Sequence, residues 1–271
     1  MAGAHKPRAL PRLILHAGFH KTGTSSVQEM LDAAREVLSP QLRILLKRDM
    51  EALTAATRDH GGAPSPESLG RVETEAARLF DRLDPADPRP LLISSEDLSG
   101  LIPGRLGRRG YPEAPALLTA LLHGLARSWG ALPEVTLYLS TRAPEAWVRS
   151  CHHHHLRVAR MRDDAASYAA AQGDATDLRA MARRIARALP EVTLATRALE
   201  ETSDLPHGPL TPLLDLAGVP GEIRDRIPAL PPANASLRGL ADQFLALNRS
   251  ELDREALKEA KKALIRKARQ G

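Results

Sequence analysis

The residues best suited to chemistry follow a short apolar run, residues 13–15, near the start of the sequence. The next segment reads GFHKTGTSS and gives Gly18 and Gly23 the G-x-x-x-x-G spacing of a phosphate-binding loop. Glycine lets backbone N–H groups approach an oxyanion closely, and the start of a helix adds its dipole. The segment therefore predicts a loop that binds a phosphate-bearing ligand. The residues expected to contact it are Gly18, Lys21, Thr22, Gly23, Thr24, Ser25 and Ser26.

The lysine of this loop is not where an ATPase has it. An ATPase loop ends in G-K-[ST], but here Gly23 is followed by Thr24, and Lys21 comes two residues before Gly23. No apolar run ends in an obvious aspartate for Mg²⁺, and phosphoryl transfer from ATP without a metal is hard to stabilise. A plain strand–turn–helix in which the lysine has no role stays open as an alternative.

A second candidate element lies in the segment LYLSTRAPEAWVRS. Arg142 follows an apolar run, which places it at the carboxyl end of a strand, where open α/β sheets bind ligands. Its guanidinium can hold a phosphate through two parallel hydrogen bonds. Pro144 can open a helix without losing a hydrogen bond, and Ser150, about two turns along, can add a hydroxyl. The alternative is a strand-terminal arginine and a solvent-facing serine.

A candidate general base follows the third apolar run, LLISSEDL. The run ends at the same predicted sheet edge, and Glu96 lies there in position to take a proton from an acceptor hydroxyl or amine. Alternatively, Glu96 caps the next turn or pairs with an arginine, and its neighbour Asp97 is the residue to test beside it. His20 precedes Lys21, and we interpret it as a residue that positions the loop. Lys21, Glu96 and His20 are thus the candidate catalytic residues.

These motifs resemble a known family. GFHKTGTSS is similar to the 5′-phosphosulfate loop of sulfotransferases that use 3′-phosphoadenosine 5′-phosphosulfate (PAPS), many of whose bacterial members read HKTGT. The arginine, proline and serine of the second element resemble the part of the family that binds the 3′-phosphate. The family's glycine-rich third motif, R-K-G, is absent, so the resemblance indicates no adenine contacts.

The resemblance implies a reaction. A sulfuryl group would pass from PAPS to a hydroxyl or amine of a carbohydrate or small-molecule acceptor, leaving 3′,5′-adenosine bisphosphate (PAP). In the family the loop lysine, here Lys21, bridges to the sulfuryl group and its leaving oxygen, and no metal is required. Arg142 and Ser150 would bind the 3′-phosphate. Glu96 stands where cytosolic members have a histidine and several carbohydrate-modifying members have a glutamate.

Two other functions compete with this interpretation. One is a nucleotide or small-molecule kinase, which requires Mg²⁺-dependent ATP turnover and is disfavoured by the missing G-K-[ST]. The other is a nucleotide-binding or polysaccharide-assembly module without catalytic turnover. Tight binding of PAP with no transfer to any acceptor would favour that module.

The elements that must position these residues alternate between apolar and amphipathic segments, as in an α/β fold. We predict a P-loop-type three-layer fold, with a central parallel sheet flanked by helices and a helical C-terminal portion. The predicted strands lie within residues 12–18, 42–48, 88–98, 134–142 and 191–197. The predicted helices lie within residues 24–38, 66–83, 116–129, 144–161 and 174–189, and residues 58–66 are a predicted loop. Thr24 or Ser25 is the expected N-cap of the first helix.

Composition limits the remaining possibilities. The 271 residues carry a formal charge of +5, which suits an anionic small ligand and does not require nucleic acid. One cysteine and no apolar run long enough to span a membrane favour a cytoplasmic protein. We expect one domain over 1–271, with a flexible segment 1–10 and a charged helix over 250–271. Consecutive histidines 152–155 cannot converge on one ion from a helix, so no metal is predicted. Oligomeric state is not predicted.

Overall fold

The computed structural model describes residues 9–104, 107–228 and 239–270 of the chain. The chain forms two compact units, each built from segments that are separate in the sequence. Unit 1 comprises residues 1–101, 111–142 and 178–229, and unit 2 comprises residues 102–110, 143–177 and 230–271. The single domain expected over 1–271 stays a prediction, and residues 1–8 of the segment expected to be flexible lie outside the described residues.

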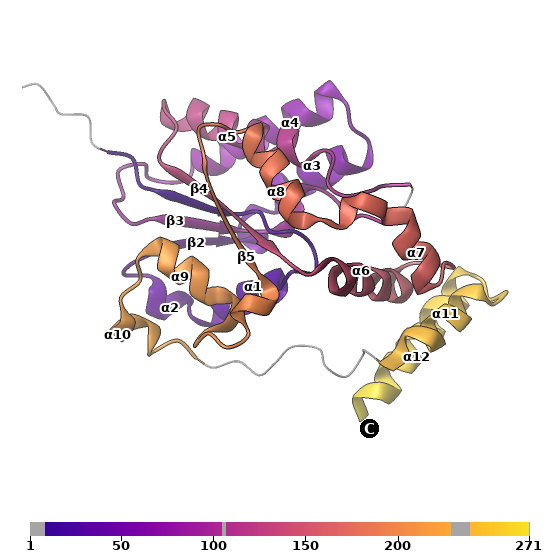
Figure 1. Cartoon of the computed structure of the whole chain (residues 1–271). Helices are drawn as coiled ribbons and strands as arrows, with labels where there is room; N and C mark the ends of the chain where they lie inside the picture. The colour runs from indigo at the N-terminus through magenta and orange to yellow at the C-terminus, as the bar shows by residue number, and fades with distance from the viewer. Residues whose placement is uncertain (1–8, 105–106, 229–238, 271) are drawn as a thin grey trace, which may run out of the picture. The chain divides into compact units, whose positions relative to one another are not determined.

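Unit 1 contains a five-stranded, all-parallel sheet (Figure 1). The strand order is β2-β3-β1-β4-β5. The strands are β1 (Leu13–His16), β2 (Arg43–Leu46), β3 (Leu91–Ser94), β4 (Val135–Thr141) and β5 (Thr193–Ala198). Every residue of β1 and β3 is buried, as expected for central strands of a parallel sheet that is covered on both faces. The α/β class with a central parallel sheet is therefore confirmed.

Helices cover both faces of this sheet (Figure 1). One layer holds α1 (Thr24–Ala33), α2 (Arg35–Leu38), α9 (Thr211–Ala217) and α10 (Gly221–Arg224). The opposite layer holds α3 (Glu51–Gly62), α4 (Pro66–Phe80), α5 (Ala114–Trp129) and α8 (Leu178–Arg187). Short 3₁₀ turns η1 (Lys47–Met50), η2 (Glu96–Ser99), η4 (Leu199–Thr202) and η5 (Gly208–Leu210) complete unit 1. These layers give the predicted arrangement of helix, sheet and helix.

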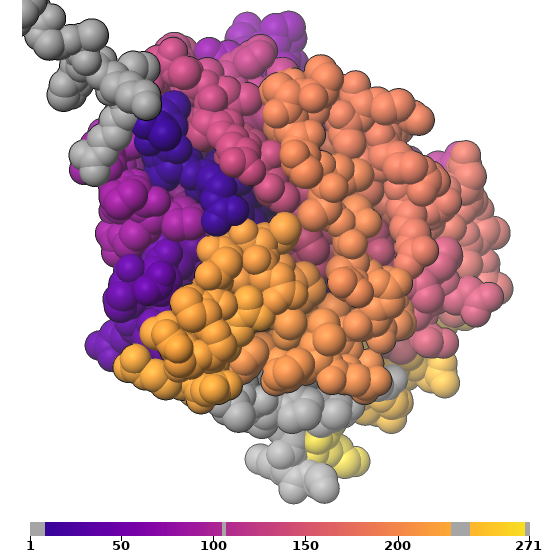
Figure 2. All heavy atoms as spheres, turned by 60° about the vertical axis from the view of Figure 1, so that its left-hand side comes forward, coloured from indigo at the N-terminus to yellow at the C-terminus, as the bar shows by residue number. Residues whose placement is uncertain are grey.

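An apolar core joins the beginning of the chain to the later part of unit 1. Val27 and Leu31 of α1 belong to one buried cluster with Leu210, Leu213 and Leu214. Figure 2 shows the orange segment that carries α9 lying against the indigo-to-violet segment that carries α1 and α2. The helix after the glycine loop is therefore held in place from outside by a part of the chain far away in sequence.

Two details of the sequence prediction are wrong. Residues 58–62 belong to α3, although a loop was expected over 58–66; Gly61 and Gly62 end the helix and do not interrupt it. The N-cap of α1 is Gly23, not Thr24 or Ser25, and no side chain caps this helix end. Gly23 has a φ of 94°, a left-handed conformation that glycine adopts without steric strain. The left-handed backbone of Gly23, and not a side-chain cap, therefore connects the loop to the helix.

The direction of the chain across the sheet reverses between β1 and β3, next to the predicted site residues. The chain leaves β1 through α1 on one face of the sheet and leaves the neighbouring β3 through α5 on the other face (Figure 1). In open α/β sheets, ligands bind outside the carboxyl ends of the strands at such a reversal. The segments that begin at residues 17 and 95 meet at this edge.

Unit 2 is helical in its described part. It contains α6 (Pro144–Val158), α7 (Ala165–Gln172), η3 (Gly173–Thr176), α11 (Ala241–Arg249) and α12 (Arg254–Gln270). The last of these is the charged helix expected over 250–271. The final carbonyls of α6 are paired with late parts of the chain, because Asn248 Nδ2 donates to Leu156 O at 3.0 Å and Lys261 Nζ donates to Leu156 O and Ala159 O at 2.7 Å each. Across the described residues, no helix combines the length and apolar character needed to cross a membrane.

Candidate active site

The glycine loop, residues 18–23, connects β1 to α1 and has an unusual backbone. Lys21 has a φ of 67° and is the one non-glycine residue with positive φ in the described part of the chain. A left-handed conformation is unfavourable for a lysine, so the surrounding contacts must hold it there. Such outliers concentrate at functional sites, and this one falls on the lysine that the sequence assigned to catalysis.

A layer of buried polar side chains lies under the loop. His16 Nδ1 is 2.8 Å from Ser94 Oγ on the neighbouring strand, and both residues are fully buried. A Cβ on Gly18 would come within 2.7 Å of His16 Nε2 and 2.8 Å of Ser140 Oγ. Both contacts are too close for real atoms, so only glycine fits at position 18 without moving the layer below. The first glycine of the motif thus has a packing role in addition to its expected approach to phosphate.

The loop hydroxyls are directed differently from one another. Thr22 Oγ1 donates to Phe19 O at 2.6 Å and lies 2.6 Å from Ser140 Oγ, while Thr24 Oγ1 is 3.4 Å from Phe19 O. Both threonines are buried, so their hydroxyls stabilise the loop from within. Ser25 is exposed and Ser26 is half-buried, which leaves their hydroxyls better placed for a ligand.

The two strand-to-helix junctions predicted from sequence meet in unit 1. Arg142 directly follows β4, and its Nη1 donates to the backbone oxygen of Lys21 at 3.0 Å. Its Nε lies 3.8 Å from Glu200 Oε1. Ser150 is half-buried on α6 of unit 2, outside the set of residues that unit 1 brings together. The juxtaposition of Lys21 and Arg142 is thus observed, and the role of Ser150 stays a prediction.

Glu96 begins η2, immediately beyond the end of β3. It is half-buried, and Gln28 Nε2 of α1 donates to its Oε2 at 2.9 Å. This bond fixes one carboxylate oxygen and ties the candidate base to the helix that follows the glycine loop. The contact from Gln28 was not expected, because nothing in the sequence spacing relates residue 28 to residue 96.

His20 is fixed by an aromatic residue from another segment. Its backbone N–H donates to Tyr111 Oη at 2.8 Å, its Nδ1 lies 3.3 Å from the same oxygen, and the two rings stack. Burial lowers the pKa of His20, and Lys47 and Lys21 lower it further, whereas Glu96 and Asp97 act in the opposite direction. A neutral imidazole held this way fits the predicted positioning role better than that of a permanent cation.

Asp97 is the centre of a charge cluster that the sequence did not reveal. Its Oδ2 lies 2.6 Å from both Lys47 Nζ and Arg58 Nη1, and its Oδ1 lies 3.8 Å from His20 Nε2. Asp97 is buried, whereas the side chains of Lys47 and Arg58 are 47% and 37% exposed. Lys47 follows β2, so its position at the carboxyl edge of the sheet was a usable signal. Arg58 lies in the stretch that was expected to be a loop.

The histidine run of α6 contains no ligand set for a metal. His152 Nε2 donates to Asp163 O at 2.8 Å, and His155 Nε2 donates to Pro103 O at 2.7 Å, so these two rings point at separate backbone carbonyls. Within the described ranges, no three side chains of His, Cys, Asp or Glu gather closely enough to hold an ion.

Comparison with known proteins adds no assignment. No protein-family model matches the chain, and no curated protein matches it.

Asp97→Asn is expected to lower the free energy of unfolding by about 1–2 kcal/mol, because Lys47 and Arg58 lose the carboxylate they share. Both cations are partly solvated, which keeps the effect below that of a fully buried pair. Urea unfolding with an unchanged m-value measures it. Asp59→Asn is the matched control, since Asp59 is 58% exposed and pairs with Arg71 at 3.2 Å. An equal loss in both variants would show that the Asp97 cluster has no special weight.

His16 should make stability fall in mild acid. Burial lowers its pKa from 6.5 to about 3, so between these values the unfolded chain binds a proton that the folded protein excludes. Stability is therefore present above the unfolded pKa and decreases as the pH falls, by about 2 kcal/mol between pH 7 and pH 5. The measurement is urea unfolding of wild type and His16→Gln at both pH values. If the two proteins show the same pH dependence, His16 is not the group responsible.

Proposed function

We propose that the protein is a sulfotransferase that moves a sulfuryl group from PAPS to a hydroxyl or amine of a carbohydrate or small molecule. The observation that carries the proposal is the hydrogen bond from Arg142 to the backbone of Lys21. Two motifs 121 positions apart in sequence, each expected to bind one anionic end of the same nucleotide, lie together at one sheet edge. A chance match of either motif alone would not require this proximity.

Each residue then has a defined task. The N–H groups of the glycine loop and the dipole of α1 hold the 5′-phosphate, and Arg142 binds the 3′-phosphate. Lys21 neutralises the charge that develops on the oxygen between phosphorus and sulfur as the S–O bond breaks. Glu96 accepts the proton of the acceptor as its oxygen or nitrogen bonds to sulfur, and PAP leaves. Catalysis rests on positioning and on electrostatic stabilisation.

The neighbouring residues support these tasks. Gln28 holds Glu96, and Tyr111 holds His20 between the loop and the charges around Asp97. The neutral form of His20 can donate a hydrogen bond without adding a positive charge beside Lys21. With His20 neutral, Lys21 is the cation of the glycine loop that would lie beside the transferred sulfuryl group.

Calorimetry separates the proposed function from its two competitors. Wild-type protein is titrated with PAP and with ATP plus Mg²⁺, and PAP is expected to bind more tightly. Tighter binding of ATP with Mg²⁺ would support a kinase and overturn the proposal. If PAP binds but no sulfuryl transfer occurs to a panel of hydroxyl- and amine-bearing saccharides, the non-catalytic module becomes the better explanation.

A further inference from the structure

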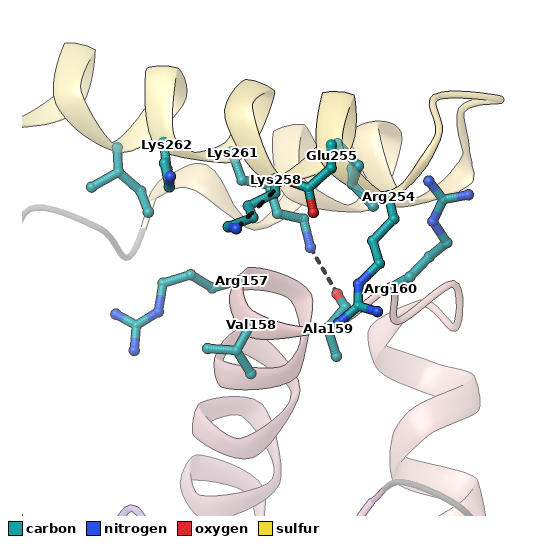
Figure 3. Close-up of a pocket in the computed structure, with 11 residues that line it drawn as sticks. Arg157, Val158, Ala159, Arg160, Arg254, Glu255, Lys258, Lys261 and Lys262 are labelled. Atoms are coloured by element: carbon teal, nitrogen blue, oxygen red, sulfur yellow. Dashed lines mark hydrogen bonds and ion pairs between the residues drawn. The ribbon is translucent and has the colours of Figure 1, made fainter.

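A separate groove lies within unit 2, between the end of α6 and the length of α12 (Figure 3). It has a volume of about 810 Å³ and contains none of the residues assigned to the nucleotide. Residues 157–160 form one wall, and α12 forms the other. Its lining combines arginine and lysine side chains with apolar ones.

Positive charge dominates the rim of this groove. Arg157 and Arg160 come from the α6 side, and Arg254, Lys258 and Lys262 come from α12. The single acid among the lining residues is Glu255, which lies 3.6 Å from Lys258. Lys262 lies 2.7 Å from Glu259, and the guanidinium of Arg160 donates to the backbone oxygen of Leu252. Five cations therefore face two acids, and the excess positive charge would attract an anionic ligand.

Lys261 is not part of the charged rim. Its side chain is buried, and its ammonium group donates to the carbonyls that end α6. Burial, together with the charge of Arg160, lowers its pKa to about 8. Lys261 therefore holds α12 against α6, and the outer lysines of the same helix remain at the surface.

The floor of the groove is apolar. Val158 is 54% exposed and is the one large apolar side chain that is exposed in the described part of the chain. Leu257 and Ile265 of α12 also line the groove. An apolar floor beneath a cationic rim matches a ligand that has both an anionic head and a hydrocarbon part.

The cationic rim and the apolar floor together favour one class of anionic ligand over others. None of the lining residues is aromatic, although stacking on aromatic rings is how proteins commonly bind single-stranded nucleic acid. A highly charged polysaccharide would use the rim but would leave the apolar floor without a role. Basic residues clustered on an amphipathic helix are instead typical of binding to acidic lipids.

We propose that this groove binds acidic phospholipid at a bilayer surface, with the head group on the cations of α6 and α12 and the acyl chain over Val158. The binding is peripheral and depends on salt, because much of the attraction is electrostatic. It is independent of the nucleotide at the glycine loop, so it can hold or fail whether or not the protein transfers sulfuryl groups.

Flotation with vesicles tests the proposal. Full-length protein is mixed with vesicles of phosphatidylcholine alone or with added phosphatidylglycerol, and binding is expected only to the second kind. Lys258→Glu with Lys262→Glu should weaken binding by about twentyfold or more, since each basic residue near an anionic surface contributes about fivefold. Val158→Ser should weaken it without any change in charge.

A matched control separates the groove from overall charge. Arg71→Glu with Arg78→Glu, on α4, changes the net charge equally at side chains 61% and 69% exposed, compared with 59% and 50% for the two lysines. This variant should bind vesicles as wild type does. Equal losses in both double variants, no binding to phosphatidylglycerol, or binding that Val158→Ser leaves unchanged would each overturn the proposal. Binding of single-stranded DNA through the same lysines, with none to vesicles, would also overturn it.

Discussion

Replacing Lys21 with alanine is expected to lower kcat for sulfuryl transfer by about 10²–10³-fold, the effect of losing one preorganised electrostatic contact to a transition state. The affinity for PAP should change by less than about tenfold, because the charge that Lys21 neutralises develops only as the S–O bond breaks. Initial rates with PAPS and calorimetry with PAP separate the two effects.

The fold should survive this change. Lys21 lies on a loop whose buried contacts come from Thr22, Gly18 and Phe19, so thermal unfolding should remain close to wild type. Lys267→Ala removes the same charge from an exposed position on α12 and serves as the control. Full activity in Lys21→Ala would contradict the catalytic assignment directly.

Arg142→Ala should remove the ability to distinguish nucleotides by their 3′-phosphate. Loss of charge-assisted hydrogen bonds to a phosphate is expected to weaken PAP binding by about 10–100-fold. Adenosine 5′-phosphate lacks the 3′-phosphate, so its affinity should change little. Calorimetry with both nucleotides on wild type and variant measures the difference.

The comparison of the two nucleotides also addresses the structural role of Arg142. Its guanidinium supports the loop through the carbonyl of Lys21, and loss of that support alone would weaken both nucleotides equally. An equal loss would therefore assign Arg142 to the loop and remove it from the 3′-phosphate. Arg197→Ala is the control, because Arg197 lies on the neighbouring β5 and its side chain is 50% exposed.

The sheet could be predicted because its strands carry strong local signals. Leu13–Leu15 and the run that begins at Leu91 are continuous apolar segments that each end at a polar residue, which is the pattern of a strand buried on both faces. The start of α1 was misplaced, because a threonine or serine is usually the better cap. Only the φ of 94° at Gly23 explains why the glycine takes that position.

Only some residues of the candidate site could be predicted from the sequence. The positions of Lys21, Glu96 and Arg142 beyond the carboxyl ends of strands could be predicted, because parallel strands share one carboxyl edge. Their roles stay predictions. Tyr111 could not be predicted, since it reaches His20 from an irregular glycine- and proline-rich stretch without periodicity. Arg58 was missed for a different reason: Gly61 and Gly62 resemble a break, yet they close a helix that carries the arginine to Asp97.

The hydrogen bonds that close the end of α6 have a consequence for how the protein is made. During translation, Leu156 and Ala159 emerge from the ribosome long before Asn248 and Lys261 are synthesised. The side chains of Asn248 and Lys261 are the hydrogen-bond donors to the carbonyls of Leu156 and Ala159. Until then these carbonyls have only water to bond. All five strands of the sheet precede α11 in the sequence, so they can leave the ribosome while unit 2 is still incomplete. A message truncated before the codon for Lys261 would therefore yield a chain with a complete set of strands and an unfinished helical unit.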